Sequence, residues 1–182
     1  MKQKTKRNAA RLTAFLLTVV MLLSSVTTAV FATEEQEVII ASQEDYDAFV
    51  AAVNGNDTYE GKTVVLQADV TATTPLKAFS GIFDGNGHTI TADNIQTANS
   101  MYAGVFNKNN GTIRNLRVDG SVSGKMYCAA ICAYNNGTID SCVNEAAGTF
   151  AGSYVGGIAG FNKGTVSNCI NRGTITCSAT SG

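Results

Sequence analysis

From residue 81 onward, short apolar segments alternate with polar corners, and the pattern recurs along the chain. Four chemically distinct columns keep one register, because the step from each member to the next is the same in every column. The columns are Ile82, Val105, Ile131 and Ile158; Asn86, Asn109, Asn135 and Asn162; Thr89, Thr112, Thr138 and Thr165; and Ile90, Ile113, Ile139 and Val166. Several columns in one register predict a structural repeat of about 25 residues.

A repeat of this length, built from short β-type segments and Gly/Asn corners, is typical of one turn of a parallel β-helix. Stacked turns lie ~4.8 Å apart, so each column becomes a ladder of like residues. We expect the aliphatic columns to fill the interior. The Asn column is expected to form a side-chain ladder at a corner, where Asn tolerates a left-handed backbone, with the following Gly as the turn.

The segment before the repeats predicts a strand followed by one helix. Residues 38–41 are β-type, and Ser42 with Asp45 forms an approximate capping box. The helix ends at Asn54-Gly55, where Gly55 is expected to take the left-handed conformation. Its apolar positions have amphipathic spacing. They are Tyr46, Phe49, Val50 and Val53.

A β-branched strand at residues 63–66 and a looser connection at 67–79 complete an N-terminal cap that spans residues 33–80. A solenoid needs a cap at each end. The helix can cover the first turn, but nothing comparable follows the last repeat. We therefore expect residues 81–182 to be repeats truncated at the C-terminus, in the N-terminal piece of a longer protein.

Residues 1–32 have the pattern of a secretory signal. Five basic residues precede an apolar run from Leu12 to Leu23, and Val30-Phe31-Ala32 fits a cleavage site. The apolar run is short for a membrane span, although an uncleaved anchor remains an alternative. We predict cleavage after Ala32 and an exported chain, secreted or at the cell surface.

Removing this leader changes the charge of the chain. The leader holds 5 of the 13 basic residues and none of the 14 acidic ones, so 8 basic residues face 14 acidic ones, a net charge of −6. An acidic chain lacks the basic footprint that nucleic acid or an anionic membrane surface requires. We expect no nucleic-acid partner and no membrane contact beyond the signal.

Two stretches resemble the GLUG-motif repeats of bacterial secreted and cell-surface proteins: Gly81-Ile-Phe-Asp-Gly-Asn-Gly-His-Thr-Ile90 and Gly157-Ile-Ala-Gly-Phe-Asn-Lys-Gly-Thr-Val166. The resemblance covers roughly residues 37–182. Such repeats occur in large adhesins and in immunoglobulin-A metalloendopeptidases of Gram-positive bacteria. The resemblance implies a right-handed parallel β-helix on an exported scaffold. It implies no protease activity, because the sequence lacks the His-Glu-x-x-His zinc motif.

His88 is the only histidine, which excludes any site that needs a His pair. It lies in the corner Asp84-Gly85-Asn86-Gly87-His88. Asp84 and Asn86 could offer oxygen ligands to Ca²⁺, but the spacing lacks the Glu that closes an EF-hand loop. A tight turn is the favoured interpretation.

Polysaccharide-cleaving β-helices need clustered or paired carboxylates. In the repeats, no two carboxylates share a predicted column, so we predict a non-enzymatic protein with no catalytic, cofactor-binding or metal-binding residues. The alternative is part of a polysaccharide-cleaving enzyme, or the scaffold of a larger metalloprotease. The repeat carboxylates are Asp84, Asp93, Asp119, Asp140 and Glu145.

Cysteines and aromatic residues have simpler interpretations. Leu116, Cys142 and Cys169 share one column, and Cys132 shares another with Phe106 and Ala159. Buried small hydrophobes are therefore favoured over disulfides, although a bridge from Cys142 to Cys169 stays open. Two aromatic columns, Phe83 with Phe106 and Tyr134 with Phe161, could stack on a sugar, but core or corner packing is favoured.

Together these patterns predict an exported, structural or adhesive β-helical module of a bacterial protein. Its partners would be a host, matrix or cell-wall glycan or protein, and further repeats of a longer parent chain. Because the repeated Asn-Asn-Gly-Thr-Ile segments are expected to be structural scaffold, we expect ligand recognition in the segments between them.

Overall fold

A computed structural model describes residues 36–96 and 100–178. The predicted signal, residues 1–32, and its cleavage site lie outside the described residues. Within the two described ranges, no helix has the length and apolar character needed to cross a membrane.

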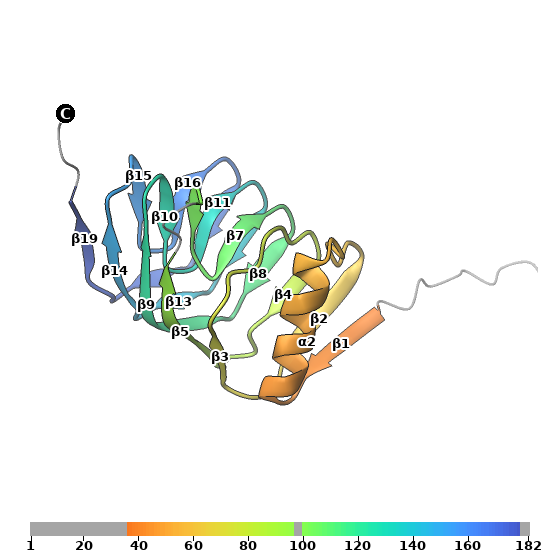
Figure 1. The fold of residues 1–182 in the computed structure, drawn as a ribbon. Coiled ribbons are helices and arrows are strands. Elements are labelled where there is room, and N and C mark those ends of the chain that lie inside the picture. The colour runs from red at the N-terminus through yellow and green to blue at the C-terminus, as the bar shows by residue number, and fades with distance from the viewer. Residues whose placement is uncertain (1–35, 97–99, 179–182) are drawn as a thin grey trace, which may run out of the picture. The chain divides into compact units, whose positions relative to one another are not determined.

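Parallel strands stack into a β-solenoid of about five turns, with one helix at the N-terminal end (Figure 1). The predicted all-β solenoid is confirmed, and among residues 36–96 and 100–178 it has the one short N-terminal helix that was expected. Before the first turn come β1 (Gln36–Ile40) and α2 (Gln43–Asn54). The first turn contains β2 (Lys62–Leu66) and β3 (Val70–Ala72), and the second contains β4 (Ile82–Asp84), β5 (Thr89–Gln96), β6 (Tyr102–Ala103) and β7 (Phe106–Asn109). The third turn contains β8 (Thr112–Arg114), β9 (Arg117–Gly124), β10 (Tyr127–Ala129) and β11 (Cys132–Asn135); the fourth contains β12 (Thr138–Asp140), β13 (Val143–Asn144), β14 (Ala147–Phe150), β15 (Tyr154–Gly156) and β16 (Ala159–Asn162); and the fifth contains β17 (Thr165–Ser167), β18 (Ile170–Asn171) and β19 (Ile175–Cys177).

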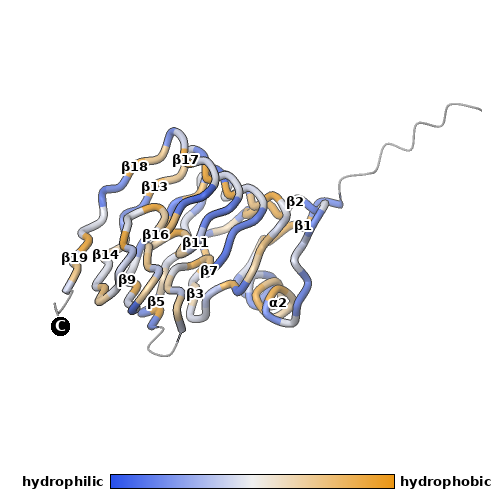
Figure 2. The backbone as a smooth tube through the Cα atoms, turned by 90° about the horizontal axis from the view of Figure 1, so that it is seen from above, coloured by the Kyte–Doolittle hydropathy of each residue, from blue (hydrophilic) through white to orange (hydrophobic). Residues whose placement is uncertain are grey.

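Four sheets run along the solenoid axis. One has the order β1-β2-β4-β8-β12-β17, and a second joins β3 and β5 to β9, which pairs with β13 and β14 and through them with β18 and β19. Two short sheets, β6-β10-β15 and β7-β11-β16, close the remaining side. Hydrophilic stretches recur from turn to turn at the corners (Figure 2).

Helix α2 forms as predicted at its start and differs at its end. The Ser42 hydroxyl accepts the Asp45 N–H at 3.2 Å, and the Asp45 carboxylate accepts the Ala41 N–H at 3.1 Å. Gly55 is not left-handed, because its φ is −84° and its N–H continues to bond the carbonyls of the last helical turn. The left-handed residue is Asn56, with φ 84°.

The predicted register is confirmed in the later repeats. Ile139 pairs with Ile113 and Val166, and Asn135 pairs with Asn109 and Asn162. The fourth turn is longer than the third by a single position, which is inserted at a corner. The insertion lies between Phe150, which pairs with Gly124, and Tyr154, which pairs with Tyr127.

The predicted register of the first repeat is wrong. Thr89 and Ile90 pair with Arg117 and Val118, and Phe83 is the residue beside Ile113. Ile82 pairs with Thr112 instead of joining the Val105 column. The physical reason is that the corner at Asn86 stacks on the corner at Asn115, where the Asn115 carbonyl accepts the Gly87 N–H at 2.8 Å.

The segment 67–79, predicted as a loose connection, is part of the first turn. It contains β3, which pairs with β5. Leu76 and Phe79 form single parallel bridges to Phe106 and Asn109. Phe79 therefore occupies the ladder position that the sequence pattern assigned to Asn86.

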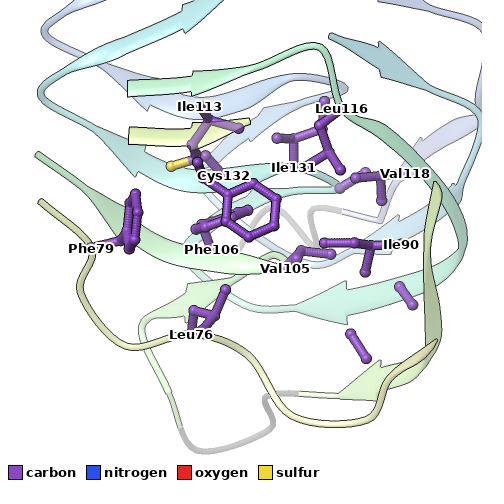
Figure 3. Close-up of a cluster of buried hydrophobic side chains, with 14 of the residues drawn as sticks. Leu76, Phe79, Ile90, Val105, Phe106, Ile113, Leu116, Val118, Ile131 and Cys132 are labelled. Carbon is purple, nitrogen blue, oxygen red and sulfur yellow. The ribbon is translucent and has the colours of Figure 1, made fainter. Parts of the chain in front are cut away.

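The interior is filled by the inward columns, with Ile113, Leu116, Ile131 and Val118 pointing into one cluster (Figure 3). The Asn ladder also lies inside, since Asn109 and Asn135 are fully buried. Each amide Nδ2 donates to the Oδ1 of the next Asn at 2.8 Å. The backbone there is extended, so the expected left-handed Asn corner is wrong for this column.

Asn86, the first member of the predicted column, is left-handed as expected, with φ 50°, and the other left-handed corners of this kind are at Asn115, Ser141 and Asn168, with φ between 51° and 54°. The glycine that follows the Asn ladder serves close approach rather than a left-handed turn. A Cβ on Gly137 would collide with the carbonyl oxygen of Gly111 on the preceding turn.

Candidate ligand-binding surface

Outward-facing aromatic rings gather on the two short sheets of the solenoid. They come from β6, β10 and β15 and from β11 and β16, with a lysine on β7 and another directly after β16. We call this group the aromatic–lysine surface. Its members are Tyr102, Tyr127, Tyr154, Tyr134, Phe161, Lys108 and Lys163.

Strand alternation explains why these rings point outward. On β10 the Cys128 side chain is buried, and its neighbour Tyr127 faces the other way. On β11 Tyr134 faces away from its two immediate neighbours, Ala133 and Asn135, which are both buried, and it is partly exposed. The interior columns of small residues therefore place the tyrosines on the outer face.

The rings form two ladders because their residues pair in register on consecutive turns. In the first ladder, Tyr127 stacks on Tyr102 at 5.5 Å between ring centroids and on Tyr154 at 5.0 Å, with interplanar angles of 20° and 18°. In the second, Tyr134 stacks on Phe161 at 5.0 Å and 25°.

Edge-to-face contacts join the two ladders into one surface. Tyr127 meets Tyr134 at 5.6 Å and 86°, and Tyr154 meets Phe161 at 5.3 Å and 88°. Both geometries are favourable for aromatic quadrupoles. Inside a ladder the ring faces cover one another, and Tyr154 remains 44% exposed.

Two lysine ammonium groups lie against the second ladder. Lys108 Nζ is 5.6 Å from the centroid of Tyr134, and Lys163 Nζ is 5.7 Å from Tyr134 and 5.8 Å from Phe161. These are cation–π distances. The side-chain hydrogen bond to Tyr134 is the largest cause of a raised pKa at Lys163.

The aromatic residues proposed from sequence divide between inside and outside. Phe83 and Phe106 are fully buried and belong to the core. Their predicted shared column is wrong, because Phe83 pairs with Ile113 and Phe106 with Cys132. The column of Tyr134 with Phe161 is confirmed.

Sequence reasoning missed Tyr102, Tyr127 and Tyr154. Their spacings lie close to the repeat period and offered a usable signal. The spacing from Tyr102 to Tyr127 is shorter by a single position than the step that the other columns share between the same two turns. That mismatch concealed the ladder.

The repeat carboxylates are paired rather than gathered. Asp84 and Asp140 do share a column, on either side of Arg114, so the prediction that no two carboxylates share one is wrong. Burial raises the pKa of Asp84, but hydrogen bonds from Asn115, the Asn86 N–H and Arg114 outweigh it and lower the pKa overall. Arg114 Nε lies 2.8 Å from this carboxylate.

Hydrogen bonds from Ser167, Asn168 and Ser141 lower the pKa of Asp140. A carboxyl with a lowered pKa is a poor proton donor to a glycosidic oxygen. Glu145 is held between two arginines, at 2.6 Å from Arg117 and 3.2 Å from Arg172. The other two carboxylates, Asp93 and Asp119, lie on β5 and β9.

The corner at His88 has the geometry of a tight turn. The Asp84 carboxylate accepts the Asn86 N–H at 2.9 Å, and Gly87 has φ 81°. His88 Nδ1 lies 3.1 Å from Asp69. Across residues 36–96 and 100–178, no group of three or more His, Cys, Asp or Glu side chains could hold a metal ion.

The cysteines lie largely in the interior, as predicted. Cys128, Cys132 and Cys142 are fully buried, and all five cysteines are unbridged. Cys142 and Cys169 occupy one column on adjacent turns, beside the paired Val143 and Ile170. Burial raises the pKa of Cys132 and of Cys142 to about 12.

Fold and surface together define a parallel β-solenoid that presents an ordered aromatic face. The chain matches no protein-family model, no curated protein and no solved structure. The resemblance to GLUG-motif repeats stays a prediction.

Proposed function

We propose that this chain is an exported, non-catalytic β-solenoid module, structural or adhesive, that binds an acidic glycan at the aromatic–lysine surface. The supporting observation is the pair of outward aromatic ladders, which follow consecutive turns and carry two ammonium groups. In the same region Met101 and Met126 are 55% and 38% exposed. Contiguous exposed apolar surface with a polar rim is typical of a binding site.

Tyrosine suits a sugar because it combines an apolar ring with a hydroxyl that both donates and accepts hydrogen bonds. The hydroxyls of Tyr102, Tyr127 and Tyr154 repeat at the spacing of the turns, ~4.8 Å. A linear polymer along the solenoid axis would therefore meet equivalent groups on successive turns. Several weak equivalent contacts on one polymer give avidity.

The charge distribution favours an acidic sugar over a neutral one or a nucleic acid. Outside the predicted leader the chain has a net charge of −6, yet the ammonium groups of Lys108 and Lys163 lie together on this surface. Two cations fit spaced carboxylates, whereas nucleic acid needs a larger basic footprint.

The test measures binding of purified chain to polygalacturonate and to the same polymer with its carboxyls methyl-esterified, by calorimetry. We expect Tyr127→Ser and Lys163→Gln each to weaken binding to polygalacturonate at least tenfold, and esterification to weaken binding to the unaltered chain. Arg172→Gln is the matched control, because it removes one exposed positive charge from the same turn on another sheet.

Equal affinity of the unaltered chain and both surface variants, or no affinity for polygalacturonate, would overturn the proposed function. The runner-up, a polysaccharide-cleaving enzyme, predicts instead that the polymer shortens during incubation with added Ca²⁺. Loss of that shortening in Asp84→Ala or Asp119→Ala would favour the enzyme.

A further inference from the structure

Counted from β15, so that each sheet contributes its final strand, the last turn of the solenoid spans residues 154–178 and differs from the turns before it in burial. Side chains of the inward columns are buried in the middle of the molecule, whereas those of the last turn are partly exposed to solvent. Ile113 and Ile139 are fully buried, whereas Val166, the next residue of their column, is 39% exposed. The same change occurs from Leu116 and Cys142 to Cys169.

The strands of this turn are also edge strands. β15, β16, β17, β18 and β19 each stand at the end of a sheet, so one backbone edge of each has no strand partner among the described residues. An unpaired parallel edge with apolar columns behind it is a template for another strand.

The Asn ladder specifies what such a strand should carry. Asn135 Nδ2 donates to Gly137 O at 3.2 Å, to Asn162 Oδ1 at 2.8 Å and to Thr165 O at 3.3 Å. Asn162 Nδ2 has only the first of these three kinds of partner, Gly164 O at 3.1 Å, within the described residues. An Asn on a following turn, with a carbonyl three residues later, would supply the other two.

A second ladder repeats this pattern. Asn144 Nδ2 donates to Asn171 Oδ1 at 2.6 Å, and Asn171 Nδ2 donates only to Gly173 O, at 3.2 Å, in the part of the chain that the structure describes. Beside it the charges alternate from turn to turn as Arg117, Glu145 and Arg172. The next member of that series, on a turn after Arg172, would be acidic. Residues 154–178 contain no acidic side chain that could take this place.

We infer that the last turn is an interface for a further parallel turn of the same repeat. That turn carries Asn at both ladder positions, an aliphatic residue over Val166 and an acidic residue beside Arg172. This inference does not depend on the glycan proposal, because it rests on the end of the solenoid and not on its aromatic side.

A second copy of this chain fits the interface less well. Two last turns face to face would bring Lys163 and Arg172 of each copy toward the same charges of the other. The N-terminal end of another copy carries β1 and α2, and its ladder position is held by Phe79 instead of Asn. The Phe79 side chain has no hydrogen-bonding group to offer the Asn162 amide.

The experiment replaces residues 179–182 with an in-register copy of residues 152–178, in which the copied Arg172 is changed to Glu. A control chain carries the same added residues in scrambled order. Hydrogen exchange is measured for the amides of β17 and β18, with β8 and β12 as internal reports that the solenoid is folded. Analytical ultracentrifugation gives the oligomeric state of each chain.

We expect the copied turn to slow exchange at β17 and β18 at least tenfold relative to the scrambled control. In a second variant, the copies of the two ladder residues, Asn162 and Asn171, are changed to Leu, and we expect most of that protection to be lost. Equal exchange in the copied and scrambled chains would overturn the inference. A dimeric unaltered chain with β17 and β18 already protected would also overturn it, in favour of a second copy.

Discussion

The molecule has two aromatic clusters of similar size that differ in geometry and position. The inner cluster, Phe49, Tyr59, Phe79, Phe83 and Phe106, is buried, and most of its contacts are edge-to-face or tilted, such as Phe79 with Phe83 at 83° and Phe83 with Phe106 at 74°. The outer cluster contains stacked rings with angles of 18° to 25°.

The difference follows from how each cluster is positioned. The outer rings occupy equivalent places on consecutive turns, so the repeat itself makes them parallel. The inner rings come from a helix, a loop and strands at non-equivalent places, so they pack by shape. Stacking of this kind therefore reports repetition, and the inner cluster marks where the repeat gives way to the cap.

The largest expected effect concerns the inner cluster. Phe49 on α2 is 2% exposed and contacts the rings of Tyr59, Phe79 and Phe83. Phe49→Ala should lower the free energy of unfolding by about 3–5 kcal/mol, because it leaves a cavity between the helix and the first turns. Denaturant unfolding measures this, and a loss below about 1 kcal/mol would contradict the role assigned to the cluster.

Asparagine side chains should show the same difference in stability between buried and exposed positions. Asn135→Ala removes the partner of Asn109 Nδ2 in the interior and should cost about 1–3 kcal/mol of unfolding free energy. The matched control is Asn136→Ala, since Asn136 is exposed and its side-chain amide donates to Asn110 Oδ1 at 2.8 Å. Equal costs at the two positions would show that burial does not set the strength of the ladder.

Truncation in the outer cluster should affect stability less. Tyr127 contacts four rings but is half-exposed, so Tyr127→Ala should cost about 0.5–1.5 kcal/mol in the same unfolding measurement. A cost as large as that of Phe49→Ala would mean that the outer ladder is chiefly a structural support, which would weaken the proposed binding role.

Removing a single tyrosine hydroxyl should change the unfolding free energy differently at a buried position and at the outer cluster. The Tyr46 hydroxyl is buried and has no hydrogen-bond partner among the described residues. Tyr46→Phe should raise the unfolding free energy by about 1 kcal/mol, since it removes a desolvated polar group. Tyr127→Phe removes a solvated hydroxyl and should leave it unchanged; a stabilisation by both variants, or by neither, would refute the distinction.

The smallest effect at neutral pH is expected for the thiols. Cys132 and Cys142 have pKa values of about 12 in the folded chain, so at pH 8 a thiol reagent should label exposed Cys177 rapidly and these two only after unfolding. Their pKa values are raised above the unfolded value near 9. The unfolded state therefore loses protons first, and stability should fall as pH rises from about 9 toward 12.

Mass spectrometry of labelled peptides identifies the reactive cysteines, and unfolding curves at pH 8 and pH 10 measure the loss. Rapid labelling of folded Cys132 at pH 8 would show that its column is open to solvent.

The later repeats could be predicted from sequence because true repeats stack in register, and Asn109, Asn135 and Asn162 pair as the pattern indicates. The register of the first repeat could not be predicted, because its sequence similarity to the later repeats does not reflect stacking in the same sheet. Thr89-Ile90 copies the letters of Thr112-Ile113 but lies on the neighbouring sheet. Contacts between turns, such as that of Arg114 with Asp84, determine that register, and the spacing of residues along the sequence does not reveal them.

The candidate surface was only half visible in sequence for a related reason. Tyr134 and Phe161 are separated by the same step as the members of the other columns, whereas the step from Tyr102 to Tyr127 is shorter than its counterparts. Whether an aromatic column faces in or out depends on which neighbours occupy the interior, as Ala133 and Asn135 do beside Tyr134. Column spacing alone does not determine that choice.

The extra position between Phe150 and Tyr154 has an evolutionary consequence. The chain lengthens at this corner, and Tyr154 still stacks on Tyr127 with ring centroids 5.0 Å apart. Length variation is thus absorbed beside the outer rings while the interior keeps its order. A lineage carrying this repeat could alter loop length here, beside the proposed binding surface, without passing through an unfolded ancestor.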